Sequence, residues 1–187
     1  GLFEASQTVT REEWRAYFDT LQLAQHYPGV LGLGFLRQLR ATEIGEYETE
    51  QRRQGLGAFH VWPPGIRDSY SAVTYIEPLN ELTEVAFGYD MASSPGRQAA
   101  MIAARDSGQV RMSGPVTLLH ASHQPARRGM LIFMPVYRPL LPGAGVGARR
   151  DALVGYVYSA SVAEELLVGL LGGGTGDISL RVDDIND

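Results

Sequence analysis

Residues 89–95, with the sequence YDMASSP, mark the point where an apolar, strand-like run ends and a helix begins. Pro95 suits the first helical position, because its missing N–H would have no partner there. Gly108 suits the left-handed end of the same helix, so the pattern predicts a helix over residues 95–107. Asp90 therefore falls at the junction of strand and helix. A carboxylate there can accept hydrogen bonds from a bound molecule or simply from its own turn.

Composition and charge exclude several classes of protein. The chain has 187 residues, of which 44% are hydrophobic and 20% are charged, values typical of a folded globular protein. Its net charge of -5 argues against binding to nucleic-acid phosphates. There is no cysteine, which excludes a disulfide framework, a zinc–cysteine site and thiol catalysis. No apolar run is long enough to span a membrane, and we expect the chain to be an excised segment of a longer protein.

Apolar runs joined by short connections predict an antiparallel sheet with helices on one side. Residues 10–13 fit a capping box, and aromatic residues then recur at helical spacing, so a first helix is expected there. The run at residues 29–37 contains alternating glycines, which permit close approach of another backbone. The central sheet is expected to be assembled from three runs, at residues 70–79, 109–119 and 129–137.

Patterns for catalysis and metal binding are weak. His120 and His123 could pair on a metal ion, but no acidic ligand lies near them in sequence, so a solvated loop is the favoured interpretation. No serine lies in a Gly-x-Ser-x-Gly motif, and nothing marks Glu77 and Asp90 as an acid–base pair. We therefore predict no enzymatic activity, no cofactor and no metal site for this segment.

Short motifs spread over more than half of the chain together carry a family resemblance. They are YPGV at 27–30 through GFL at 34–36, VTYIEP at 73–78, FGYDM at 87–91, RDSG at 105–108, SGPVTL at 113–118 and FMPVY at 133–137. As an ordered set they resemble the CHASE domain. That domain is the extracytoplasmic sensor module of membrane-bound histidine kinases, diguanylate cyclases and related receptors.

The resemblance implies an α/β (α+β) fold with a long N-terminal helix and two PAS-like antiparallel units. The corresponding divisions are a helix at 1–27, a membrane-distal ligand-binding unit at 28–137, a loop at 138–150 and a partial membrane-proximal unit at 151–187. The parent is then expected to be a homodimeric signal-transduction receptor, anchored by membrane helices outside this segment. The segment itself is expected in the periplasm or outside the cell.

The resemblance also implies a set of ligand-binding residues. In the cytokinin receptors of this family, an aspartate matching Asp90 accepts hydrogen bonds from an adenine-type ring. A main-chain group at the position of Met112 contributes, as does a hydroxyl at the position of Ala121 or Ser122; Ala121 would lack that hydroxyl. A cytokinin-like adenine derivative is therefore one candidate ligand. Five apolar residues are expected walls of the pocket, although each suits an ordinary core equally well: Tyr75, Phe87, Met112, Met130 and Phe133.

Three hypotheses for the function make different structural predictions. A small-molecule sensor predicts a pocket with Asp90 at its mouth, beside the electropositive start of the helix at residue 95. A protein- or peptide-sensing interaction module predicts a filled core and an exposed apolar patch. An unrecognised hydrolytic enzyme predicts that His120, His123 or Glu77 lines a cleft.

Overall fold

An antiparallel sheet forms the centre of the fold. The computed structural model describes residues 9–27, 29–118 and 127–162. In these residues six strands form one sheet in the order β2-β1-β6-β5-β3, with β4 also paired to β5, and every strand pair is antiparallel. The expected mixed α+β class with an antiparallel sheet is confirmed.

Four long strands carry most of the sheet. They are β1 (Val30–Arg40), β2 (Ser69–Glu77), β5 (Arg128–Tyr137) and β6 (Leu153–Ser161). The expected strand at 109–119 is instead two short pieces on the edge of β5, namely β3 (Arg111–Met112) and β4 (Val116–Thr117). The ladder is interrupted between them. Ser113 there uses its hydroxyl to accept the Leu131 N–H, and Pro115 has no N–H to donate.

Strand β6 lies in the middle of the sheet, which the sequence pattern did not indicate. It pairs with β1 along one edge and with β5 along the other. The expected boundary at residues 138–150 therefore does not coincide with an edge of this sheet. That stretch is also not all loop, because α7 (Val146–Ala152) begins inside it. The division into a distal and a proximal unit stays a prediction.

Local sequence signals account for the helices. Thr10 and Glu13 form the expected capping box at the start of α2 (Arg11–Leu21), with distances of 3.2 and 2.7 Å. Gln22 then adopts a left-handed conformation before α3 (Leu23–His26), so one long N-terminal helix is not confirmed. The remaining helical elements are η1 (Ala41–Glu43), α4 (Ile44–Arg53), α5 (Glu81–Glu84), η2 (Met91–Ser93) and α6 (Pro95–Ser107).

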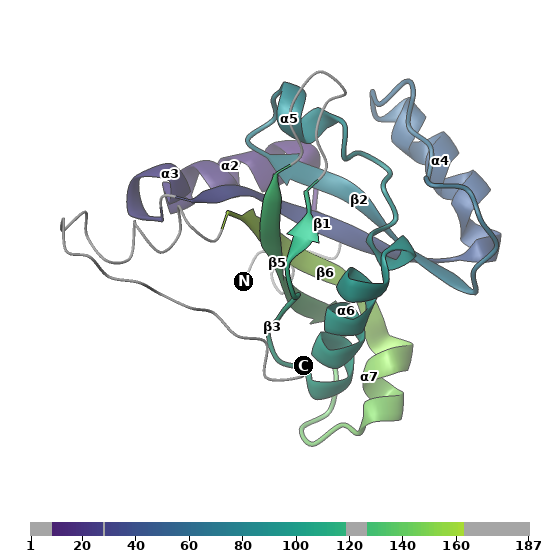
Figure 1. The fold of residues 1–187 in the computed structure, drawn as a ribbon. Helices are drawn as coiled ribbons and strands as arrows, with labels where there is room; N and C mark the ends of the chain where they lie inside the picture. Colours follow the sequence, from purple (N-terminus) through teal and green to yellow (C-terminus); the bar gives the residue numbers. More distant parts are fainter. Residues whose placement is uncertain (1–8, 28, 119–126, 163–187) are drawn as a thin grey trace, which may run out of the picture.

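Helices cover both faces of the sheet rather than the single face that was expected. Phe35 and Leu36 are neighbours in β1 and point to opposite faces, so each face has its own apolar cluster. On one face Trp14 of α2 packs with Phe35. On the other face Met101 of α6 packs in the larger cluster with Leu36 and Phe133. Figure 1 shows α6 and α7 together at one end of the sheet and α2 and α3 at the other.

The segment before α6 is a turn, not the strand expected from its apolar residues. Tyr89 and Asp90 make only isolated bridges, to Trp62 and Ala72. Gly88 turns the chain with φ +74°, and a Cβ there would lie 1.9 Å from the carbonyl oxygen of His60. Glycine is therefore required at this position, because the backbone of residue 60 passes directly against it.

Candidate functional site

Asp90 is a fully buried anchor of the turn that leads into α6. Its side chain is 0% exposed, and Oδ1 accepts hydrogen bonds from the N–H groups of Ser71 (2.8 Å) and Ala92 (3.1 Å). Its own N–H donates to the Trp62 carbonyl at 2.6 Å. One carboxylate oxygen thus caps η2 and links it to β2. This corresponds to the alternative from the sequence in which Asp90 bonds to its own turn.

Arg67 supplies the positive charge next to Asp90. Its Nη1 lies 3.4 Å from Oδ2, an oxygen that has no hydrogen bond, and the Arg67 side chain is 25% exposed. The expectation of an open carboxylate beside the start of α6 is therefore corrected. The short helix η2 separates Asp90 from α6, and Arg67 compensates the charge instead of the helix amides.

A cavity of about 470 Å³ opens beside the N-terminus of α6. Two segments distant in sequence form its walls: the turn into α6 and the chain around β4. The lining residues are Tyr89, Ser94, Gly96, Arg97, Pro115, Val116, Thr117 and Leu118. The described lining residues thus combine apolar side chains with the hydroxyl residues Ser94 and Thr117, a phenol and one cation.

Arg97 is the charged group of this cavity. It is 4% exposed, its Nη2 donates to the Thr117 carbonyl at 2.6 Å, and its guanidinium lies 5.1 Å from the centre of the Tyr89 ring. Its Nε is buried and has no hydrogen-bond partner. No carboxylate in the described part of the chain forms an ion pair with Arg97.

The apolar residues expected to form one pocket are spread over both faces of the sheet, although the Arg11 guanidinium lies 5.8 Å from the centre of the Tyr75 ring and 5.1 Å from that of Phe87. Phe133 is fully buried in the cluster under α6, against Tyr156. Tyr75 lies on the other face of the sheet, where its hydroxyl donates to the Val9 carbonyl at 2.7 Å. Phe87 packs at the margin of the α6-side cluster. None of the three is among the residues that line the cavity.

The remaining expected site residues are at the edge of the sheet or beyond the described residues. Met112 is exposed in β3, where it pairs with Ile132, and Met130 is partly buried in β5. Ala121 and Ser122 lie outside the described residues. The proposed ligand roles of all these residues therefore stay predictions.

The sequence pattern did not single out Arg97, although a signal was present. The first turn of a helix favours acidic side chains, because its unpaired amides are electropositive. The first turn of α6 contains no acidic residue and places an arginine third, after Pro95 and Gly96. A cation in that position interacts unfavourably with the helix dipole. Helix stability therefore does not explain the arginine, which marks it as a candidate functional residue.

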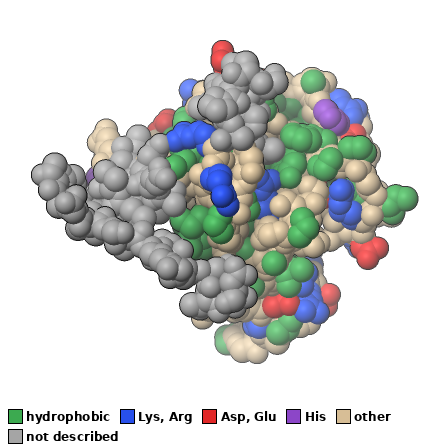
Figure 2. All heavy atoms as spheres, in the orientation of Figure 1, with side chains coloured by type: hydrophobic (Ala, Val, Ile, Leu, Met, Phe, Trp, Pro, Cys, Tyr) green, Lys and Arg blue, Asp and Glu red, His purple; other side chains and the backbone are tan. Residues whose placement is uncertain are grey.

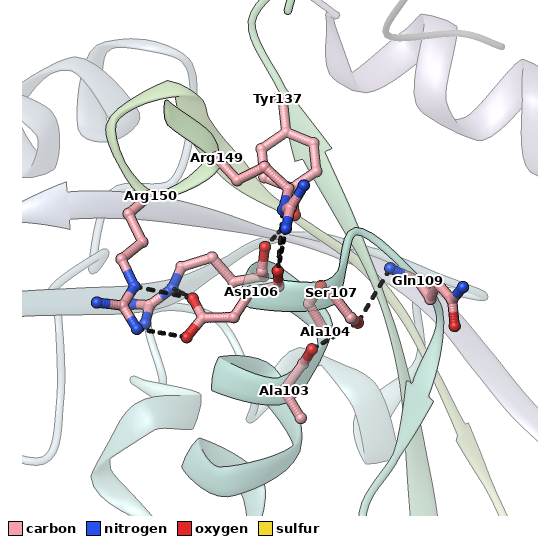
Figure 3. Close-up of polar contacts among 9 residues, drawn as sticks. Ala103, Ala104, Asp106, Ser107, Gln109, Tyr137, Arg149 and Arg150 are labelled. Carbon is pink, nitrogen blue, oxygen red and sulfur yellow. Dashed lines mark hydrogen bonds and ion pairs between the residues drawn. The ribbon is translucent and has the colours of Figure 1, made fainter. Parts of the chain in front are cut away.

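A second polar cluster joins the C-terminus of α6 to α7 (Figure 3). The Asp106 carboxylate pairs with Arg105 at 2.7 Å and with Arg150 at 2.6 Å, and these hydrogen bonds hold its pKa well below the ordinary value. Arg149 donates through Nε and Nη2 to the Asp106 carbonyl, at 2.9 and 2.6 Å. Arg149 thus satisfies a carbonyl that the end of α6 leaves unpaired.

The candidate catalytic and metal-binding residues are not brought together at the cavity in the part of the chain that the structure describes. Within them, no group of three or more His, Asp or Glu side chains could hold a metal ion. Glu77 is buried, accepts the Leu79 N–H at 2.9 Å and does not line the cavity. His120 and His123 lie outside the described residues.

Taken together, the fold and the cavity define an α+β domain with a partly polar pocket at one helix end. The CHASE domain family model matches residues 7–187, essentially the whole chain, and the chain belongs to that family. No curated protein matches the sequence. CHASE domains are extracytoplasmic sensor domains of membrane receptors, and their role is sensing rather than catalysis. Within the described residues, no helix has both the length and the apolar character to cross a membrane.

Proposed function

We propose that this chain is the ligand-sensing domain of a transmembrane histidine kinase or diguanylate cyclase, and that it binds a small molecule beside α6. The observation that carries the proposal is the cavity of about 470 Å³ between residues 89–97 and 115–118. Its volume lies in the range of small-molecule sites, about 300–1,000 Å³, and such sites combine apolar walls with a few polar groups. An adenine derivative belongs to the candidate ligands, as do small organic acids and amino acids.

The position of α6 suggests how binding could reach the rest of the receptor. The cavity touches the first turn of α6, and the Asp106 cluster joins the last turn of the same helix to α7 and so to β6. A ligand that favours one position of α6 would therefore also influence the position of β6, the central strand of the sheet. A ligand shifts such an equilibrium only by its difference in affinity for the two states. The proposal includes a PAS-like character for this sheet, a homodimeric parent and membrane helices that flank the segment.

The distribution of apolar side chains favours a small molecule over a protein or peptide partner. Exposed large apolar residues are spread along the described chain, for example Met134 in β5 and, in loops, Ile66, Val110 and Leu141. On the face shown in Figure 2, outside the grey residues, apolar side chains are interspersed with charged and polar ones. An interaction module is expected instead to gather such residues in one patch.

A thermal-shift screen tests the proposal. Adenine derivatives, amino acids and organic acids are each added to the 187-residue chain, and a true ligand raises the melting temperature because it binds the native state. The stabilisation is about 2.7 kcal/mol at a ligand concentration of 100 Kd. Amide chemical shifts then locate the site, with changes expected at residues 94, 96, 97 and 116–118 and none on α4. Changes that cluster elsewhere would contradict the proposed site.

A screen that finds no ligand in any of the three classes, combined with binding of a protein partner, would favour the interaction module.

A further inference from the structure

Arg97 is a buried cation for which the described residues supply no counter-charge. Burial of an unpaired charge is costly, and the usual compensation is an ion pair with hydrogen bonds. Arg97 has one hydrogen bond to a neutral carbonyl and one ring contact, and Nε–H remains without a partner. These contacts hold the guanidinium in place but leave its charge uncompensated.

The surroundings of Arg97 add to the positive potential. The guanidinium belongs to the first turn of α6, a helix of 13 residues whose N-terminal amides are electropositive. Ser94, the residue before the helix, makes no side-chain cap. Tyr158 is buried, and this burial raises the pKa of its hydroxyl, which disfavours a negative charge there.

We propose that the cavity beside α6 binds the carboxylate group of a small organic acid, with Arg97 as its ion-pair partner. The inference rests on the proposed function and specifies the chemical class of ligand. Arg97 lines the cavity and provides the positive charge for a carboxylate, and the amides of the first helical turn provide hydrogen-bond donors. Tyr89, Val116 and Leu118 then provide apolar contact for the body of the acid.

The charge balance favours a carboxylate over a phosphate. Among the lining residues that the structure describes, Arg97 is the only cationic side chain. A carboxylate carries one negative charge, which one guanidinium neutralises, whereas a phosphate monoester carries about 1.5 to 2 at neutral pH. A phosphate would therefore remain partly uncompensated in this site.

A pair of probes that differ in charge but hardly in shape tests the inference. Phenylacetate and phenylacetamide are titrated into the 187-residue chain to about 20 mM, which detects even millimolar affinity, and amide chemical shifts are followed. We expect phenylacetate to shift the amides of Ser94, Gly96 and Arg97. It should bind at least about tenfold more tightly than phenylacetamide, as a charged hydrogen bond requires. Equal binding of both probes would overturn the carboxylate assignment but leave the cavity as a ligand site. Binding of neither would overturn this inference, and the ligand screen then decides the proposed function separately.

Substitutions of Arg97 test whether this residue causes the preference for phenylacetate over phenylacetamide. Arg97→Gln keeps a donor for the Thr117 carbonyl and removes the charge, so the preference for phenylacetate over phenylacetamide should disappear. Arg97→Lys keeps the charge and should retain part of the preference. Arg15→Gln makes the same change in net charge at an exposed position of α2 and should have no effect.

A preference that persists in a folded Arg97→Gln protein would contradict the proposal. Tighter binding of phenyl phosphate than of phenylacetate would overturn the choice of a carboxylate. If Arg97→Gln fails to fold, the comparison of acid and amide in the unmodified chain still decides.

Discussion

At the scale of single residues, burial changes what is expected of Asp90. Its carboxylate accepts hydrogen bonds from two backbone N–H groups and lies next to Arg67. The Asp90 side chain is 0% exposed. The sequence predicted Asp90 at the mouth of an open pocket, where a carboxylate contributes little to the core. The structure instead assigns Asp90 a share of the stability, whatever its role toward a ligand.

Asp90→Ala should lower the free energy of unfolding by about 2–4 kcal/mol, since it leaves two buried N–H groups without an acceptor and Arg67 without a counter-charge. Asp90→Asn keeps an oxygen for the two N–H groups and should cost about 1–2 kcal/mol. Urea unfolding measures both values. Asp68→Asn, an exposed neighbour with the same change in charge, is the control and should unfold like the unmodified chain. An unchanged unfolding midpoint for Asp90→Ala would mean that the turn does not depend on the carboxylate.

At the scale of elements, the Asp106 cluster fastens α6 to α7. The two arginine partners hold the pKa of Asp106 below its usual value of 3.8, so the charged form is favoured in the folded state. A carboxyl group with a lowered folded-state pKa stabilises the fold above the pKa of the unfolded chain. That contribution is lost as the pH falls from about 4 toward the folded-state value.

Asp106→Asn should therefore lower the free energy of unfolding by about 1 kcal/mol at pH 7, the scale of a partly exposed ion pair. The difference from the unmodified chain should shrink as the pH is lowered below about 4, because the native carboxyl then becomes protonated as well. Urea unfolding at constant ionic strength follows this difference. Asp151→Asn changes an exposed carboxylate on α7 and serves as the control. A difference that does not vary with pH would show that the ion pairs contribute nothing to stability.

At the scale of the whole molecule, the sheet depends on a strand from the last part of the described chain. A chain that ends after residue 150 lacks β6, which leaves β1 and β5 without their shared partner. We expect this fragment to lose cooperative unfolding and dispersed amide shifts. A matched fragment that ends after residue 162 keeps every described strand and should retain both. A shorter fragment with a folded spectrum would support the boundary at residues 138–150 that the sequence suggested.

The sequence by itself determined where individual helices begin and end, and it indicated the family. The ends of α6 follow from Pro95 and Gly108, and the start of α2 follows from Thr10 and Glu13, because each signal acts on backbone groups within one turn. The ordered motifs indicated the CHASE family because each motif is a continuous stretch of the sequence.

Only the tertiary structure decided which segments meet. The insertion of β6 between β1 and β5, the pairing of Asp90 with Arg67 and the contact of Asp106 with Arg150 all join positions distant in sequence. No local pattern encodes such contacts, since they depend on how the whole chain packs. The same holds for the cavity beside α6, whose two walls are about twenty residues apart and come together only because β4 pairs with β5. Arg97 became a candidate through its burial, which is a property of the folded chain and not of any single segment.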